Sequence, residues 1–144
     1  MKTLLPVLLT LFLTACADPV LRPPPANVDT ELQGTWLANK AELAGKNLPL
    51  PPGFVLIVTG DRYAAGKPND FGKLVYFGDE LAGQARRMDV VGEDGPNKGK
   101  RFPAIYRISG RELEICYDLS GKERPADFVS REGTMILRVS YAKK

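Results

Sequence analysis

A chain of 144 residues, 44% of them hydrophobic, has the length and composition of one globular domain and not of a disordered protein. Its formal net charge of +3 is too small to indicate nucleic-acid binding, so we expect no nucleic-acid partner. The sequence contains no histidine, which excludes Ser-His-Asp and Cys-His catalysis within one chain and removes the commonest zinc ligand.

The first residues have the pattern of a secretion signal. Lys2 gives a positive start, and residues 4–13 form an apolar run that is too short to cross a bilayer as a helix. Leu13-Thr14-Ala15-Cys16 resembles the processing box of bacterial lipoproteins, in which the cysteine becomes the lipidated first residue of the mature protein. We therefore expect a removed signal peptide at 1–15 and a lipid on Cys16 that holds the protein on a membrane. The alternative is a buried N-terminal helix with a chance cysteine at its end.

The residues after the cysteine predict a location and a tether. An aspartate directly after the lipidated cysteine would resemble an inner-membrane retention signal, but this position is Ala17. We therefore expect the protein to be attached to the outer membrane of a bacterial envelope, facing the periplasm. Prolines are frequent in residues 17–28 and favour extended polyproline II. We assign residues 16–30 to the lipidated cysteine and a proline-rich tether, and residues 31–144 to the folded domain.

The rest of the chain has the signals of short strands. Runs of β-branched, aromatic and other apolar residues, separated by glycine, proline and aspartate, predict strands. These runs lie at 34–38, 54–59, 73–77, 86–91, 102–108, 111–117, 127–130 and 135–141. A helical turn is expected at 80–84. About eight short strands with regular turns predict an all-β fold, an antiparallel up-and-down barrel, with a strongly bent sandwich as the alternative.

One hairpin can be predicted in detail, between the strands at 102–108 and 111–117. A two-residue loop at Ser109-Gly110 places nearly every large apolar side chain on one face. The other face then receives Arg107 opposite Glu112, an attractive cross-strand pair. The side chains expected to face the interior are Tyr106, Leu113, Ile115 and Tyr117.

Three groups of chemically active residues favour structural interpretations. Cys116 would be the only thiol besides Cys16, and glutamates beside it predict an unreactive thiol. Glu112 and Glu114 lie roughly 7 Å apart along one strand face, as in an inverting glycosidase, but a solvated face is the preferred interpretation. Basic loop residues are candidates for an anion-binding patch, with a solvated surface preferred: Lys98, Lys100, Arg101, Lys122 and Arg124.

Acidic residues do not form a recognisable metal site. Asp89, Glu93 and Asp94 are too few and too irregularly spaced for a calcium loop, which needs ligands at alternating positions. We expect no metal and no cofactor.

Several blocks of sequence together resemble a known family. Gly34-Thr35-Trp36 opens the folded region, Thr59-Gly60-Asp61-Arg62-Tyr63 follows the first long strand, and Gly121-Lys122-Glu123-Arg124-Pro125 precedes Phe128. Over residues 31–141 these blocks are similar to the small lipocalin-like domain family common in planctomycetes. The Gly-Lys-x-Arg-Pro block is the most specific of them.

The resemblance implies a lipocalin-like barrel and a pair of residues that closes it. In lipocalins a Gly-x-Trp on the first strand packs at the closed end under a basic residue of the last strand. Trp36 matches the first part, and Arg138 is the candidate for the second. The alternative is that Trp36 is ordinary core and that Arg138 faces water.

The resemblance also implies binding of a small apolar or amphipathic ligand inside the barrel. The candidate ligand-binding residues are the interior ones of the predicted hairpin, Tyr106, Leu113, Ile115 and Tyr117. The alternative function is an envelope protein-interaction module, such as a hydrolase inhibitor or a structural lipoprotein, with a filled barrel. We expect a monomer without enzymatic activity.

Overall fold

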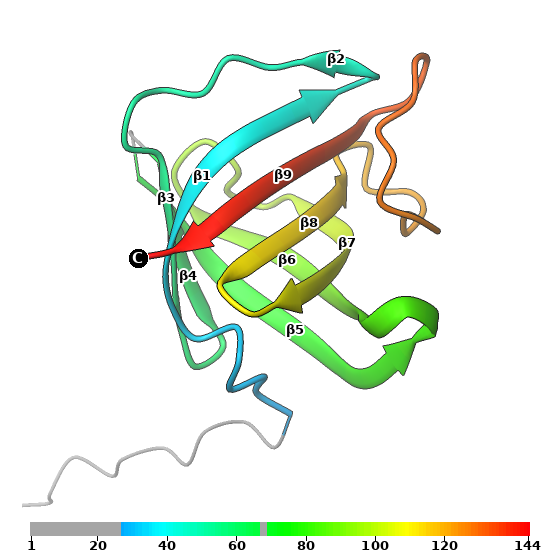
Figure 1. Ribbon diagram of the computed structural model, residues 1–144. Helices are drawn as coiled ribbons and strands as arrows, with labels where there is room; N and C mark the ends of the chain where they lie inside the picture. Colours follow the sequence, from blue (N-terminus) through cyan, green and yellow to red (C-terminus); the bar gives the residue numbers. More distant parts are fainter. Residues whose placement is uncertain (1–26, 67–68) are drawn as a thin grey trace, which may run out of the picture.

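Antiparallel strands in one continuous sheet make up most of the computed structural model, which describes residues 27–66 and 69–144. The strands are β1 (Gly34–Leu43), β2 (Lys46–Asn47), β3 (Val55–Thr59), β4 (Arg62–Ala65), β5 (Asp70–Leu81), β6 (Ala85–Asp94), β7 (Arg101–Ser109), β8 (Glu112–Asp118) and β9 (Ile136–Lys143). Their order is β2-β1-β3-β4-β5-β6-β7-β8-β9, and β1 also pairs with β9 (Figure 1). That pairing closes the sheet, so the predicted all-β, up-and-down barrel is confirmed. The signal peptide, Cys16 and most of the predicted tether lie outside the described residues.

Local predictions differ from the structure at several places. The strand predicted at 127–130 is wrong, because these residues belong to the connection between β8 and β9. Strand β4 was not predicted, because its sequence Arg-Tyr-Ala-Ala carries only one large apolar side chain. The helical turn expected at 80–84 is present as a short 3-10 helix, η1 (Ala82–Gln84).

The β7–β8 hairpin is formed as predicted, but its register is shifted by two residues. Ser109 pairs with Glu112, so the loop is Gly110-Arg111 and not Ser109-Gly110. Gly110 has a φ of 59°, which suits glycine at the first central position of a type II′ turn. The shift places Arg107 opposite Glu114 in place of Glu112. Because the shift is an even number of residues, the interior and exterior faces stay as predicted.

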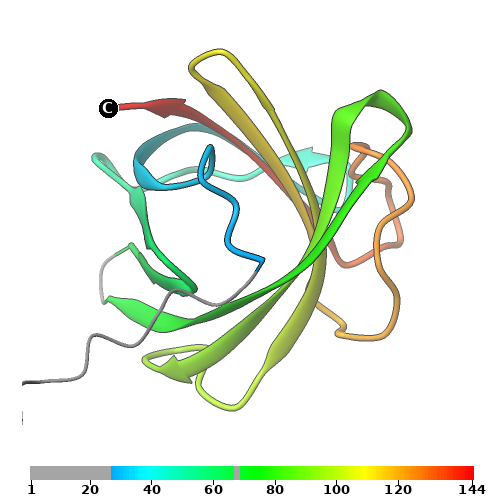
Figure 2. The same cartoon turned by 90° about the horizontal axis from the view of Figure 1, so that it is seen from below.

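The N-terminal segment 27–33 closes one end of the barrel, the end where β1 begins and β9 finishes (Figure 2). Leu32 and Trp36 are both fully buried there, and Trp36 Nε1 donates to the Leu32 carbonyl oxygen at 2.8 Å. Asp29 accepts hydrogen bonds from the Tyr106 hydroxyl at 2.7 Å and from Arg86 Nη1 at 2.6 Å. Although burial opposes it, these hydrogen bonds hold the pKa of Asp29 below its ordinary value. The folded domain therefore begins before the predicted boundary at residue 31.

The β8–β9 connection, residues 119–135, lies against the outer face of the barrel. Asp118 organises its start, because its carboxylate accepts the backbone N–H groups of Ser120 at 2.9 Å, Lys122 at 3.0 Å and Glu123 at 2.8 Å. Farther along, Phe128 packs against the Arg107 guanidinium, 4.3 Å from its ring centroid. Hydrogen bonds to one carboxylate thus set the path of the chain across the outer face.

Arg124 fastens this connection to the barrel wall. Its Nη1 donates to the carbonyl oxygens of Met88 at 2.6 Å and Ala104 at 2.8 Å, and its Nη2 donates to Asp89 at 2.6 Å. Asp89 is 2% exposed and also accepts from Arg101 Nε at 2.8 Å. The Gly-Lys-x-Arg-Pro block singled out in the sequence therefore supplies a structural contact.

A cavity at the open end of the barrel

The barrel interior holds a cavity of about 280 Å³ in the half away from segment 27–33. Its floor includes Leu32 of that closing segment. Its wall is apolar and is contributed by most of the strands, for example by Leu56, Val58, Leu74, Val90, Leu137 and Val139. Strand alternation puts these side chains inside because the pleat directs every second residue of each strand toward the axis.

The connection from β2 to β3 lies over the mouth of this cavity. Leu48, Pro49, Leu50 and Pro51 contribute to its lining, and Leu50 packs against the hydrophobic core. Phe54 completes this edge and lies over Gly66: a Cβ atom on Gly66 would fall 2.5 Å from the Phe54 ring. Gly66 therefore allows the aromatic ring to approach the backbone at the rim.

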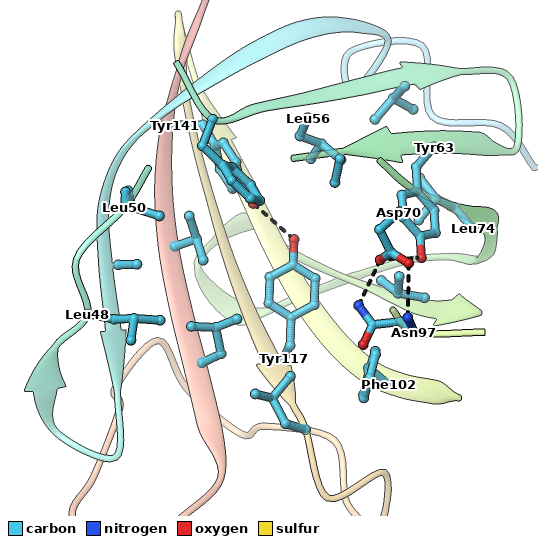
Figure 3. A pocket seen from close by; sticks show the side chains of 18 of the residues that line it. Leu48, Leu50, Leu56, Tyr63, Asp70, Leu74, Asn97, Phe102, Tyr117 and Tyr141 are labelled. Carbon is cyan, nitrogen blue, oxygen red and sulfur yellow. Dashed lines mark hydrogen bonds between the residues drawn. The ribbon is translucent and has the colours of Figure 1, made fainter. Parts of the chain in front are cut away.

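A polar cluster lies in one wall of the cavity (Figure 3). Asp70 Oδ2 accepts from the Asn97 side-chain amide at 2.7 Å and from the Tyr63 hydroxyl at 3.2 Å, while its Oδ1 accepts the Asn97 backbone N–H at 3.2 Å. Burial, and after it the Asp70 carboxylate, raises the pKa of Tyr63. A Cβ on Gly72 would lie 2.0 Å from the Val91 backbone oxygen and 2.6 Å from the Tyr63 ring, so glycine at 72 makes room for both. The cluster joins the β4–β5 end of the barrel to the β6–β7 loop.

The hydroxyls of two further tyrosines, on the adjacent strands β8 and β9, point toward one another in the cavity (Figure 3). The hydroxyl oxygens of Tyr117 on β8 and Tyr141 on β9 lie 3.3 Å apart, and either can be the donor. Burial raises the pKa of Tyr141 to about 12. Burial, together with the Tyr141 hydroxyl, also raises the pKa of Tyr117 well above its ordinary value. Both hydroxyls therefore keep their protons at any ordinary pH.

The structure places only one of the four predicted ligand-binding residues at this cavity. Tyr117 lines it, whereas Tyr106, Leu113 and Ile115 pack in the closed half of the barrel and are at most 2% exposed. Tyr106 instead bonds Asp29. Lining residues that sequence reasoning did not propose as binding residues are Tyr63, Asp70, Asn97, Phe102 and Tyr141. Tyr141 could have been found from the sequence, because Leu137, Val139 and Tyr141 alternate along the predicted strand at 135–141 and therefore share one face.

The expected contact between Trp36 and Arg138 is not formed, which corrects the predicted closing pair. Lys143 takes that place, with its Nζ 4.9 Å from the Trp36 ring centroid. Trp36 and Lys143 are direct partners in the β1–β9 register. Arg138 belongs to the opposite, exterior face of β9, where its Nε donates to Glu114 at 2.5 Å and its Nη1 to Glu42 at 3.3 Å.

The other candidate residues lie in structural contacts. Glu114 binds both Arg138 and Arg107, whose Nε donates at 2.6 Å, while Glu112 is exposed. Cys116 is fully buried on the exterior face of β8, and burial, with Glu114 second, raises its pKa to about 12.

The basic loop residues do not all remain available for an anion. Of the basic loop residues proposed as an anion-binding patch, Arg101 and Arg124 bind Asp89. Lys98, Lys100 and Lys122 are exposed. Within residues 27–66 and 69–144, no cluster of three His, Cys, Asp or Glu side chains is arranged to bind a metal ion. In the same part of the chain no helix has the length and hydrophobicity needed to cross a bilayer.

Comparison of the chain with protein-family models, with curated proteins and with solved structures gave no match.

Proposed function

We propose that this protein binds a small, largely apolar ligand inside its barrel and performs no catalysis. The observation that carries the proposal is the cavity of about 280 Å³ with an apolar wall and a mouth at one end of the barrel. Binding pockets for small molecules typically measure roughly 300–1,000 Å³ and are mostly apolar with a few polar groups, so this cavity lies near the lower limit.

Packing energetics supports the same proposal. Protein interiors are normally close-packed, and the atoms that line a void lose the dispersion contacts they would make in a filled core. An apolar ligand of suitable size restores those contacts and removes its own surface from water. The alternative, an envelope protein-interaction module, was expected to have a filled barrel, and the cavity favours the ligand-binding proposal over it.

A cavity-filling substitution with a matched control tests this function. Ala65 lines the cavity, whereas its neighbour Ala64 pairs with Ile57 and Phe71, whose side chains are exposed on the exterior face. We expect the neutral fluorescent probe N-phenyl-naphthylamine to bind the wild-type protein, Ala65→Phe to weaken binding at least tenfold, and Ala64→Phe to leave it unchanged. Fluorescence titration measures all three. Absence of binding to the wild type, or equal binding to both variants, would reject the proposal.

We propose further that a lipid on Cys16 attaches the protein to the outer membrane of a bacterial envelope, facing the periplasm. The support is the processing-box sequence Leu13-Thr14-Ala15-Cys16 after the short apolar run. We expect Cys16→Ser to move the protein from the membrane fraction to the soluble fraction and to abolish incorporation of labelled fatty acid. The Cys116→Ser variant should stay in the membrane fraction and serves as the matched control. Labelling of Cys16→Ser as strong as that of the wild type would contradict the anchor.

A further inference from the structure

The two tyrosine hydroxyls that meet in the cavity have two donor protons, and only one of these is used in the hydrogen bond between them. The Tyr117 and Tyr141 hydroxyls are 3.3 Å apart, and their mutual bond is the one hydrogen bond that either hydroxyl makes to the described residues. A hydroxyl carries one proton and accepts at its oxygen. The shared bond uses one of the two protons, so the other is free to donate to a third group.

The surroundings of this pair are apolar. The cavity wall includes Leu137, the register partner of Tyr117, and Val139, two residues before Tyr141. Among the described residues, neither hydroxyl makes a hydrogen bond to a third side chain. In the other polar cluster of the cavity, the Tyr63 hydroxyl already donates its proton to Asp70. An apolar group placed beside this proton would leave it without a hydrogen bond, which is unfavourable, whereas an acceptor atom of a bound molecule would pair with it.

The charges at the cavity indicate which kind of acceptor fits. The described residues that line it include one carboxylate, that of Asp70, and no lysine or arginine. A ligand carboxylate or phosphate inside would be desolvated without a counter-ion and would face Asp70. The raised pKa values of both tyrosines keep the pair uncharged and able to donate. An uncharged oxygen acceptor meets these conditions, and an anionic head group does not.

We propose that the ligand is an uncharged molecule with an apolar body and one oxygen acceptor, which takes the free proton of the Tyr117–Tyr141 hydroxyl pair. A ketone, ester or ether oxygen at one end of a hydrocarbon chain has this chemistry. The inference rests on the proposed function, because it names the ligand class of the same cavity. It assigns the two hydroxyls a role in selecting the ligand in addition to packing.

The test uses three probes with the same number of non-hydrogen atoms: heptyl methyl ketone, n-decane and octanoate. Each is titrated against the protein by displacement of N-phenyl-naphthylamine. We expect the double variant Tyr117→Phe/Tyr141→Phe to bind the ketone roughly 3- to 10-fold more weakly, as for the loss of one hydrogen bond. Binding of n-decane should not weaken, which also shows that the double variant keeps its fold and its cavity. Octanoate should bind the wild type more weakly than the ketone at neutral pH.

Tyr63→Phe is the matched control. It removes a hydroxyl from the same cavity, but one that already donates to Asp70. Its ratio of ketone to n-decane affinity should equal that of the wild type. A ratio that falls as much in Tyr63→Phe as in the double variant, or that falls in neither, overturns the inference. Wild-type protein that binds octanoate more tightly than the ketone overturns it as well.

A measurement on the wild-type protein avoids the variants altogether. A carbonyl that accepts a hydrogen bond absorbs at lower infrared frequency than the same carbonyl in a hydrocarbon. We expect the bound ketone to show the lowered frequency, and a hydrocarbon-like frequency would overturn the inference. If none of the probes binds, the proposed function fails. If n-decane and the ketone bind without tyrosine dependence, only the ligand class fails.

Discussion

Replacing Trp36 by alanine should lower the free energy of unfolding by about 3–5 kcal/mol, the cost typical of removing a large aromatic side chain from a core. Trp36 is fully buried, and its indole N–H donates to the Leu32 carbonyl oxygen at 2.8 Å. The substitution removes the ring from the closed end and leaves that carbonyl without its donor. Denaturant unfolding followed by circular dichroism measures the change.

Trp36→Phe separates the two contributions to this loss. It keeps most of the buried ring but loses the indole N–H, so we expect it to cost less than half as much as Trp36→Ala. Val129 is 46% exposed, so Val129→Ala, our surface control, should change stability by less than about 1 kcal/mol. A loss for Trp36→Ala as small as the one at Val129 would show that the closed end contributes little to stability.

Replacing Asp89 by alanine should cost about 3 kcal/mol, because it leaves a cation without its partner beneath the β8–β9 connection. Asp89 is buried on the exterior face of β6 and accepts from Arg124 at 2.6 Å. Arg124 would remain held by two carbonyl oxygens, but its charge would lose the carboxylate to which it is hydrogen-bonded. We expect residues 119–135 to detach more often and trypsin to cleave there faster. Urea unfolding and limited proteolysis measure the two effects.

A double-mutant cycle and a single control make this prediction specific. Asp89→Ala combined with Arg124→Met should cost clearly less than the sum of the two single changes, because the unpaired charge beneath the connection is then absent. The second partner of Asp89, Arg101, has a side chain that is 58% exposed. Arg101→Met should therefore cost less than about 1 kcal/mol. Strictly additive costs at Asp89 and Arg124 would contradict the coupling.

The strands could be predicted where apolar residues alternate or run together, and not where backbone pairing alone decides. Residues 102–108 and 111–117 carried enough apolar side chains to identify both faces, which the structure confirms. The predicted register was wrong by two residues. The apolar pattern could not reveal this error, because an even shift leaves every side chain on the same face of the sheet. Residues 127–130 have the composition of a strand, but Phe128 packs on Arg107 from outside the barrel.

The candidate site was less predictable, because it depends on contacts between distant segments. Asp70 bonds Asn97, which lies 27 residues later in the chain, and no local pattern in the sequence indicates that contact. To predict that Lys143, and not Arg138, lies over Trp36, one would need to know the register between the first and last strands. That register includes an irregularity between Ala38 and Lys40, which no sequence pattern indicated.

The pairing of β1 with β9 has a consequence for the order in which the protein folds. The other strand pairs of the barrel join consecutive strands or, for β1 and β3, strands separated only by the two-residue β2, but Trp36 and Lys143 come from the two ends of the barrel sequence. Hairpins can form as soon as their strands are available, whereas this last pairing must wait for the C-terminus and must close a long loop. Until then the edges of β1 and β8 are unpaired and able to associate with other chains. The cavity, whose wall includes Leu137, Val139 and Tyr141 of β9, is therefore among the last parts of the molecule to form.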